Sequence, residues 1–145
     1  MRVYASARHP EKILSASEYH NQTATPTSEA NQQRVMNRIA DAALLLIDVQ
    51  CGIDELPLGE RNNPDAESNI GLLLLHWREH GRTVIHVQHD STEPASPLRP
   101  EHPGNAIKAQ AQPLPGEPVF RKNVNSAFIG TGLEDHLQQL GAGNC

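Results

Sequence analysis

Apolar runs and amphipathic stretches give the second part of this chain a clear order of elements. The run from Ala42 to Ile47 shows no alternation and ends at Asp48, a pattern typical of a strand buried on both faces of a parallel sheet. A buried helix shares this pattern, but the turn-rich stretch 51–63 that follows favours a strand. A second strand is predicted over Thr83–Gln88, which is rich in β-branched residues.

An amphipathic helix is predicted between these two strands, over Pro64–His80. Asn63 is a suitable N-cap, and Pro64 would then take the first helical position, where its missing N–H costs nothing. Gly81 stands where a C-terminal glycine is expected. The apolar residues at helical spacing are Ile70, Leu73, Leu74 and Trp77. Strand, helix and strand in this order predict a βαβ unit with parallel strands.

The chain after the second strand is first loop-like and then helical. Seven prolines fall between residues 89 and 118, a loop long enough to suggest a functional role. A short third strand is predicted at Pro118–Arg121, and a helix is predicted from Thr131 to Gly141 with Leu133, Leu137 and Leu140 on one face. Because such a helix normally leads into another strand, we expect an α/β sheet that is incomplete at the C-terminus, with an open hydrogen-bonding edge.

Residues 1–40 differ in composition from the rest, because they are rich in Ser, Thr, Asn, Gln and Glu. We expect a polar N-terminal extension over 1–40 that is partly helical or disordered, followed by a partial domain over 41–145. Within the extension, 1–27 is predicted to be mostly irregular, and Ser28–Asp41 could form one helix.

Charge and cysteine content narrow the classes of function. The formal net charge of −5 argues against a nucleic-acid partner, because phosphate binding needs a basic surface. No apolar run reaches the roughly 18 residues of a membrane-spanning helix, and no secretory signal is evident. Two cysteines, Cys51 and Cys145, cannot build a disulfide framework. We therefore expect a cytoplasmic protein without a membrane partner.

Asp48 and Lys122 are the residues whose positions suggest chemistry. Asp48 follows the first strand, at the edge of a parallel sheet where ligands bind, so it is a candidate general base or, alternatively, a cap of the following turn. Lys122 follows the third strand, where it could stabilise a thiolate or could simply be a solvated surface residue.

The remaining candidates for chemistry have weaker support. His86 and His89 are three residues apart on a strand and would face opposite ways, which disfavours a shared metal. Cys51 lies in a turn with only Asp48 nearby, and Cys145 is the last residue, so neither is expected to be a nucleophile. No glycine-rich phosphate loop is present. We expect neither a metal nor a cofactor.

Three segments in this order resemble the isochorismatase-like cysteine hydrolases. They are Leu44–Gln50, which ends in Asp-Val-Gln, Val84–Ser91, and Arg121–Phe128, in which Lys122 precedes Ser126-Ala127-Phe128. The Asp-x-Gln motif alone is weak, whereas the ordered set is quite specific. The resemblance covers about residues 42–140 and implies a Rossmann-like parallel sheet with flanking helices.

The resemblance also implies a triad of Asp, Lys and Cys. Asp48 matches the Asp that takes the thiol proton, and Lys122 matches the Lys that supports the thiolate. The family's Cys opens the helix after the next strand, which would place it roughly 10 residues beyond Cys145. The chain is therefore expected to lack the nucleophile and to be inactive alone.

Substrates in such a family are small amides or isochorismate-type vinyl ethers. The Asp-x-His motif of the nicotinamidase branch is absent, and a small amide with hydrolysis of a C–N bond is the favoured substrate. We expect a small-molecule substrate and a possible homo-oligomer. The alternative is a non-catalytic remnant or pseudoenzyme that binds a small ligand or a partner chain.

Overall fold

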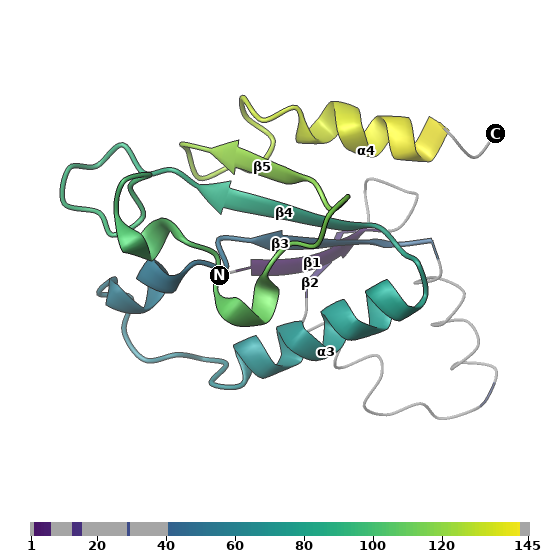
Figure 1. The fold of residues 1–145 in the computed structure, drawn as a ribbon, viewed down its shortest axis with the longest axis horizontal. Helices are drawn as coiled ribbons and strands as arrows, with labels where there is room; N and C mark the ends of the chain where they lie inside the picture. The colour runs from purple at the N-terminus through teal and green to yellow at the C-terminus, as the bar shows by residue number, and fades with distance from the viewer. Residues whose placement is uncertain (1, 7–12, 16–28, 30–40, 143–145) are drawn as a thin grey trace.

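The computed structural model describes residues 2–6, 13–15, 29 and 41–142, which form one mixed sheet with helices on both sides (Figure 1). The strand order is β2-β1-β3-β4-β5. Three strands are parallel: β3 (Ala43–Ile47), β4 (Val84–His89) and β5 (Val119–Lys122). The predicted α/β fold with a parallel sheet and flanking helices is confirmed.

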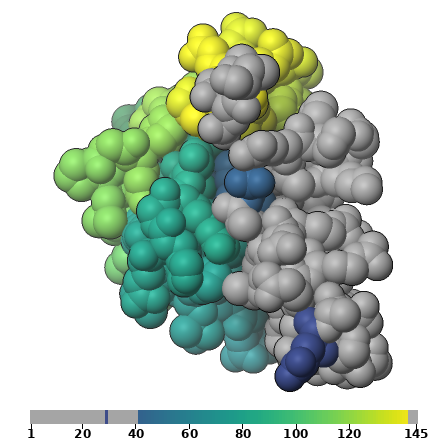
Figure 2. All heavy atoms as spheres, turned by 90° about the vertical axis from the view of Figure 1, so that its right-hand side faces the viewer, coloured from purple at the N-terminus to yellow at the C-terminus, as the bar shows by residue number. Residues whose placement is uncertain are grey.

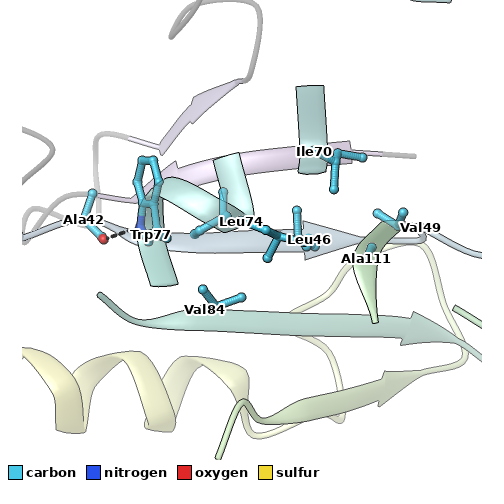
Figure 3. Packing of buried hydrophobic residues seen from close by; sticks show 9 residues of the cluster. Ala42, Leu46, Val49, Ile70, Leu74, Trp77, Val84 and Ala111 are labelled. Atoms are coloured by element: carbon cyan, nitrogen blue, oxygen red, sulfur yellow. Dashed lines mark hydrogen bonds between the residues drawn. The ribbon is translucent and has the colours of Figure 1, made fainter. Parts of the chain in front are cut away.

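The central strands β3 and β4 are buried on both faces, because one helix packs on each side of the sheet. Helix α3 (Ala66–Glu79) covers one face and α4 (Leu133–Ala142) covers the other (Figure 1). Leu44 and Leu46 of β3 pack with the α3 side, where the indole of Trp77 donates to the Ala42 carbonyl at 2.9 Å (Figure 3). Leu45 and Ile47 pack with the α4 side. This two-sided burial explains why the sequence of β3 is uniformly apolar.

The ends of α3 differ in how well they were predicted. The helix begins at Ala66 with Asp65 as its N-cap, so the predicted start at Pro64 is wrong. Ala66 N donates to the Asn63 carbonyl, which closes a tight turn before the first helical hydrogen bond from Asn69 to Asp65. The predicted C-terminal glycine is confirmed: Gly81 has a φ of +62°. Its N–H donates to Arg78 and that of Arg82 donates to Trp77, which satisfies two terminal carbonyls.

Two short strands precede the parallel sheet, at its other edge. Strand β1 (Arg2–Ser6) pairs antiparallel with β3, from Arg2 opposite Ile47 to Ser6 opposite Ala43, and β2 (Ile13–Ser15) pairs with β1. The prediction of mostly irregular structure over 1–27 is therefore wrong for these two segments, and β1 covers the edge of β3 that faces away from β4. Strand pairing uses backbone groups, so polar composition did not reveal it. The helix predicted over Ser28–Asp41 lies almost entirely outside the described residues.

The carboxyl ends of the parallel strands are covered by the proline-rich loop between β4 and β5. This loop contains two short 3-10 helices, η2 (Pro103–Asn105) and η3 (Ala109–Ala111), and it lies beside η1 (Cys51–Glu55), at the left of Figure 1. A single bridge joins Gln50 to Ile107. Figure 2 shows the side that lies at the right of Figure 1, away from this loop, with α4 at the top. No helix among the described residues is long and apolar enough to cross a membrane.

Candidate functional site

Three adjacent parallel strands end in polar residues that meet at one edge of the sheet. Asp48 follows β3, His89 ends β4, and Lys122 ends β5 directly beside His89 in the strand register. The ammonium nitrogen of Lys122 lies 3.1 Å from Oδ1 and 3.2 Å from Oδ2 of Asp48. The predicted approach of Asp48 and Lys122 is confirmed. We call these three residues the Lys122 cluster.

Lys122 is buried, with 2% of its side chain exposed, so its charge must be compensated within the protein. Besides Asp48, its ammonium faces Nδ1 of His89 at 3.2 Å and the carbonyls of Val124 and Asn125 at 3.3 Å each. The chain turns back immediately after β5, and this turn brings both carbonyls over the ammonium. The lysine is therefore held from four directions rather than solvated at the surface.

Asp48 has an unusual backbone and an unused acceptor. Its φ of +59° makes it the only non-glycine residue with a positive φ in the described part of the chain. Asp tolerates this left-handed conformation better than most residues, and such strain often marks functional sites. Lys122 donates its hydrogen bond to Oδ2, whereas Oδ1 is buried and accepts no hydrogen bond within the described structure despite its proximity to the ammonium. Oδ1 therefore interacts with Lys122 through charge rather than through a well-aligned hydrogen bond.

His89 was considered in the sequence only as half of a disfavoured metal site, and its contact with Lys122 was missed. Burial and the nearby ammonium of Lys122 lower the pKa of His89, against the opposite effects of Asp48 and Asp90. The ring is therefore neutral at neutral pH. A signal was present in the sequence, because each of three consecutive predicted strands ends in or just before a polar residue.

A buried amide network fixes the backbone around the Lys122 cluster. Gln50 is fully buried, and its side chain accepts from the N–H of His89 and donates to the carbonyls of His89 and Asn105. Asn105, from the proline-rich loop, donates to the carbonyls of His89 and Leu98 and to Asp90. These bonds tie the ends of β3 and β4 to the loop, so the loop is a structural part of the site.

The comparisons with known proteins agree with this geometry. A family profile described as the isochorismatase domain matches residues 42–145. The chain belongs to the isochorismatase family. The family protein YrdC of Bacillus subtilis (strain 168) is 48% identical over 96 residues, which are 66% of this chain and 51% of YrdC.

Solved structures of the family show the same fold. A family protein from Chromobacterium violaceum ATCC 12472 is 50% identical, with a TM-score of 0.63, and the match covers 67% of this chain and 50% of that chain. The N-carbamoylsarcosine amidase of Thermoplasma acidophilum shares the fold at 22% identity, with a TM-score of 0.52 over 68% of this chain and 61% of the amidase. The chain thus spans about half the length of YrdC and of the Chromobacterium violaceum protein.

Arg121, next to Lys122 in the family motif, has a different role from its neighbour. Its guanidinium makes two hydrogen bonds of 2.6 Å to Asp90 and one of 3.1 Å to Gln88. Burial alone would raise the pKa of Asp90, but the hydrogen bonds from Arg121 and Asn105 outweigh burial and lower it. Arg121 therefore links β5 to the end of β4 and does not take part in the Lys122 cluster.

The other candidates named from the sequence of this family member do not join the cluster. His86 is buried on the α3 side of the sheet, where its Nε2 lies 3.0 Å from Glu117. Cys51 is exposed, and no hydrogen bond or ion pair described for Asp48 or Lys122 involves it. Cys145 lies outside the described residues. Within the described ranges, no group of three His, Cys, Asp or Glu residues could hold a metal ion.

Proposed function

We propose that this chain supplies the Asp and the Lys of a cysteine-hydrolase site, with Asp48 as the base and Lys122 as the group that stabilises the thiolate. The observation that carries the proposal is the buried ion pair at the carboxyl edge of the sheet, 3.1 Å between Nζ and Oδ1. A surface lysine would not be held by a carboxylate, an imidazole and two carbonyls.

The geometry supports a different role for each of the two residues. A thiol placed against Oδ1 of Asp48 would meet an oxygen that makes an ion pair with Lys122 but accepts no hydrogen bond within the described residues. The carboxylate would take the thiol proton, and the sulfur would add to the carbonyl carbon. The C–N bond would then break, with the amine leaving with the proton held by Asp48, and water would hydrolyse the resulting thioester. The ammonium of Lys122 would stabilise the negative charge on sulfur, because a nearby cation favours the thiolate over the thiol.

The nucleophile is the part that the described residues do not provide. The contacts of the ion pair include no cysteine, and Cys51 is exposed on η1. We therefore propose that the 145-residue chain alone has little hydrolase activity, since covalent catalysis requires a thiol against the base.

A small amide is the proposed substrate class of the complete site. Attack by a thiolate suits an amide carbonyl, which becomes a tetrahedral oxyanion, whereas an isochorismate-type vinyl ether offers no such carbon at its scissile bond. The Thermoplasma acidophilum relative, named as an N-carbamoylsarcosine amidase, provides an example of amide chemistry on this fold.

A fusion protein tests this proposal. Residues 1–142 would be joined to the half of the Chromobacterium violaceum protein that this chain does not match, and turnover of small amides and vinyl ethers would be measured beside the intact relative. We expect amide turnover in the fusion, and a loss of at least about a hundredfold in Asp48→Asn and in Lys122→Met. Glu79→Gln, on an exposed residue near the end of α3, is the matched control.

Two results would contradict the proposal. Amide turnover that survives both substitutions would show that Asp48 and Lys122 do not perform the chemistry. A well-folded fusion without turnover, beside an active intact relative, would favour the alternative of a non-catalytic domain that binds a ligand or a partner chain.

A further inference from the structure

The ammonium of Lys122 has one side-chain contact that the proposed chemistry does not use. Asp48 is the proposed base, and the carbonyls of Val124 and Asn125 belong to the turn that follows β5. The remaining acceptor is Nδ1 of His89, 3.2 Å from Nζ. An ammonium has three hydrogens to place, so an acceptor on the β4 side helps to determine its orientation.

The backbone of His89 is fixed independently of its ring. Its N–H donates to Oε1 of Gln50 at 2.8 Å, and its carbonyl accepts from Gln50 and Asn105 at 3.0 Å each. In the sheet register, His89 lies directly opposite Lys122. The position of the imidazole beside the ammonium is therefore built into the strand ends and does not depend on a mobile segment.

The contact determines which ring nitrogen carries the hydrogen. An ammonium can only donate, so Nδ1 must accept and the hydrogen must be on Nε2. The charged groups that face the ring are Lys122 on β5, Asp48 after β3, and Asp90 next to it in the chain. Burial and the ammonium lower the pKa of His89 and keep the ring neutral, whereas the two carboxylates act in the opposite direction.

We propose that His89 is a positioning residue, whose Nδ1 holds the ammonium of Lys122 in the orientation that faces the reacting thiol. This role rests on the proposed function for its catalytic meaning, although the contact itself can be tested without substrate. Loss of the acceptor would leave the ammonium held only by Asp48 and by the carbonyls of Val124 and Asn125, with nothing to direct it from β4. Protonation of the ring would place a second cation against the ammonium and would weaken the contact at low pH.

Nitrogen-15 NMR of the 145-residue chain tests the positioning role, through the tautomer of His89 and the hydrogen exchange of the Lys122 ammonium. We expect the hydrogen of His89 on Nε2, and a slowly exchanging ammonium. In His89→Ala the exchange should be about tenfold faster, as expected for the loss of one hydrogen bond to a charged group. In His89→Asn, whose side-chain oxygen can replace Nδ1, it should return close to the original rate.

Controls separate positioning from a general loss of structure. His80→Asn, at the far end of α3, should leave the ammonium exchange unchanged. Backbone spectra report whether each variant folds, and if His89→Ala does not fold, the His89→Asn result and the tautomer of the unsubstituted chain decide. A hydrogen on Nδ1, unchanged exchange in folded His89→Ala, or fast exchange in folded His89→Asn would overturn the proposal.

The exchange measurement and the fusion-protein assay test the positioning role of His89 and the proposed function separately. Unchanged ammonium exchange in His89→Ala overturns the positioning role, whatever the fusion protein turns over. Amide turnover that does not depend on Lys122 overturns the proposed function, while the exchange measurement still reports whether His89 holds the ammonium.

Discussion

At the scale of single residues, the site is a buried cation at the end of β5, with acceptors from the ends of two neighbouring strands and from the turn after β5. Asp48 and Lys122 could be predicted because Asp48 follows an apolar run, Lys122 follows the predicted third strand, and both resemble positions of the family's motifs. The polar ends of the predicted strands were a signal for the position of His89, but the contacts of His89 and Asn105 could not be predicted, because they depend on the strand register and on how the long loop folds back. The spacing of residues in the sequence reveals neither the strand register nor the path of the loop. The positions of the candidate residues were therefore predictable, and the side chains around them were not.

The ion pair gives a prediction for stability. Asp48→Asn should lower the free energy of unfolding by about 2 kcal/mol, because it removes the carboxylate from a buried ammonium. Asn also tolerates the left-handed backbone at this position, so the substitution tests the charge rather than the φ of +59°. Urea unfolding measures the change, with Glu79→Gln as the control. A change below about 0.5 kcal/mol would indicate that other acceptors compensate the lysine.

At the scale of elements, burial decided which predictions succeeded. The strands β3 and β4 and the helix between them have strong apolar patterns, and they appear where those patterns predict. In α4, Leu133 is fully buried and Leu137 packs against the sheet, but Leu140 is 38% exposed. Only the first part of its predicted apolar face is therefore covered. Strands β1 and β2 pair through backbone groups that composition does not report.

Two glycines give opposite predictions for the elements that contain them. A Cβ on Gly104 of η2 would lie 2.5 Å from the Pro97 carbonyl oxygen and 2.8 Å from Cα of Gly52, so Gly104→Ala should destabilise the fold by about 2 kcal/mol. A Cβ on Gly71 of α3 would meet nothing within 4 Å, so Gly71→Ala should stabilise it by about 0.5–1 kcal/mol. Thermal unfolding of both variants checks the signs. A neutral Gly104→Ala would mean that η1 and η2 pack less closely than described.

At the scale of the whole molecule, charged networks connect segments that are far apart in the sequence. Arg78 of α3, His86 of β4 and the loop residue Leu114 all bind Glu117. Burial raises the pKa of Glu117, but these hydrogen bonds outweigh burial and lower it to about 2. A second network joins Lys108 to Asp54 and Glu67, and Arg61 also contacts both carboxylates. These networks hold the loops against α3.

These networks predict how stability depends on pH. The pKa of Glu117 falls from its ordinary 4.5 to about 2 in the folded chain, so its contribution is complete above 4.5 and is lost as the pH falls towards 2. His86, whose pKa is lowered by burial from 6.5 despite Glu117, adds a loss that begins below 6.5. Unfolding measured across this range should show both losses. Glu117→Gln should reduce the loss of stability between about pH 4.5 and 2. If the slope of stability against pH in this range were unchanged, the loss could not be assigned to Glu117.

Amide turnover by the purified 145-residue chain tests whether the described residues supply the proposed base and lysine without a nucleophile. A panel of small amides would be assayed with the chain and with Cys51→Ser and Cys145→Ser. We expect turnover at the background rate for the unsubstituted chain and for both cysteine variants. Robust turnover that either substitution abolishes would identify that cysteine as the nucleophile and contradict the account.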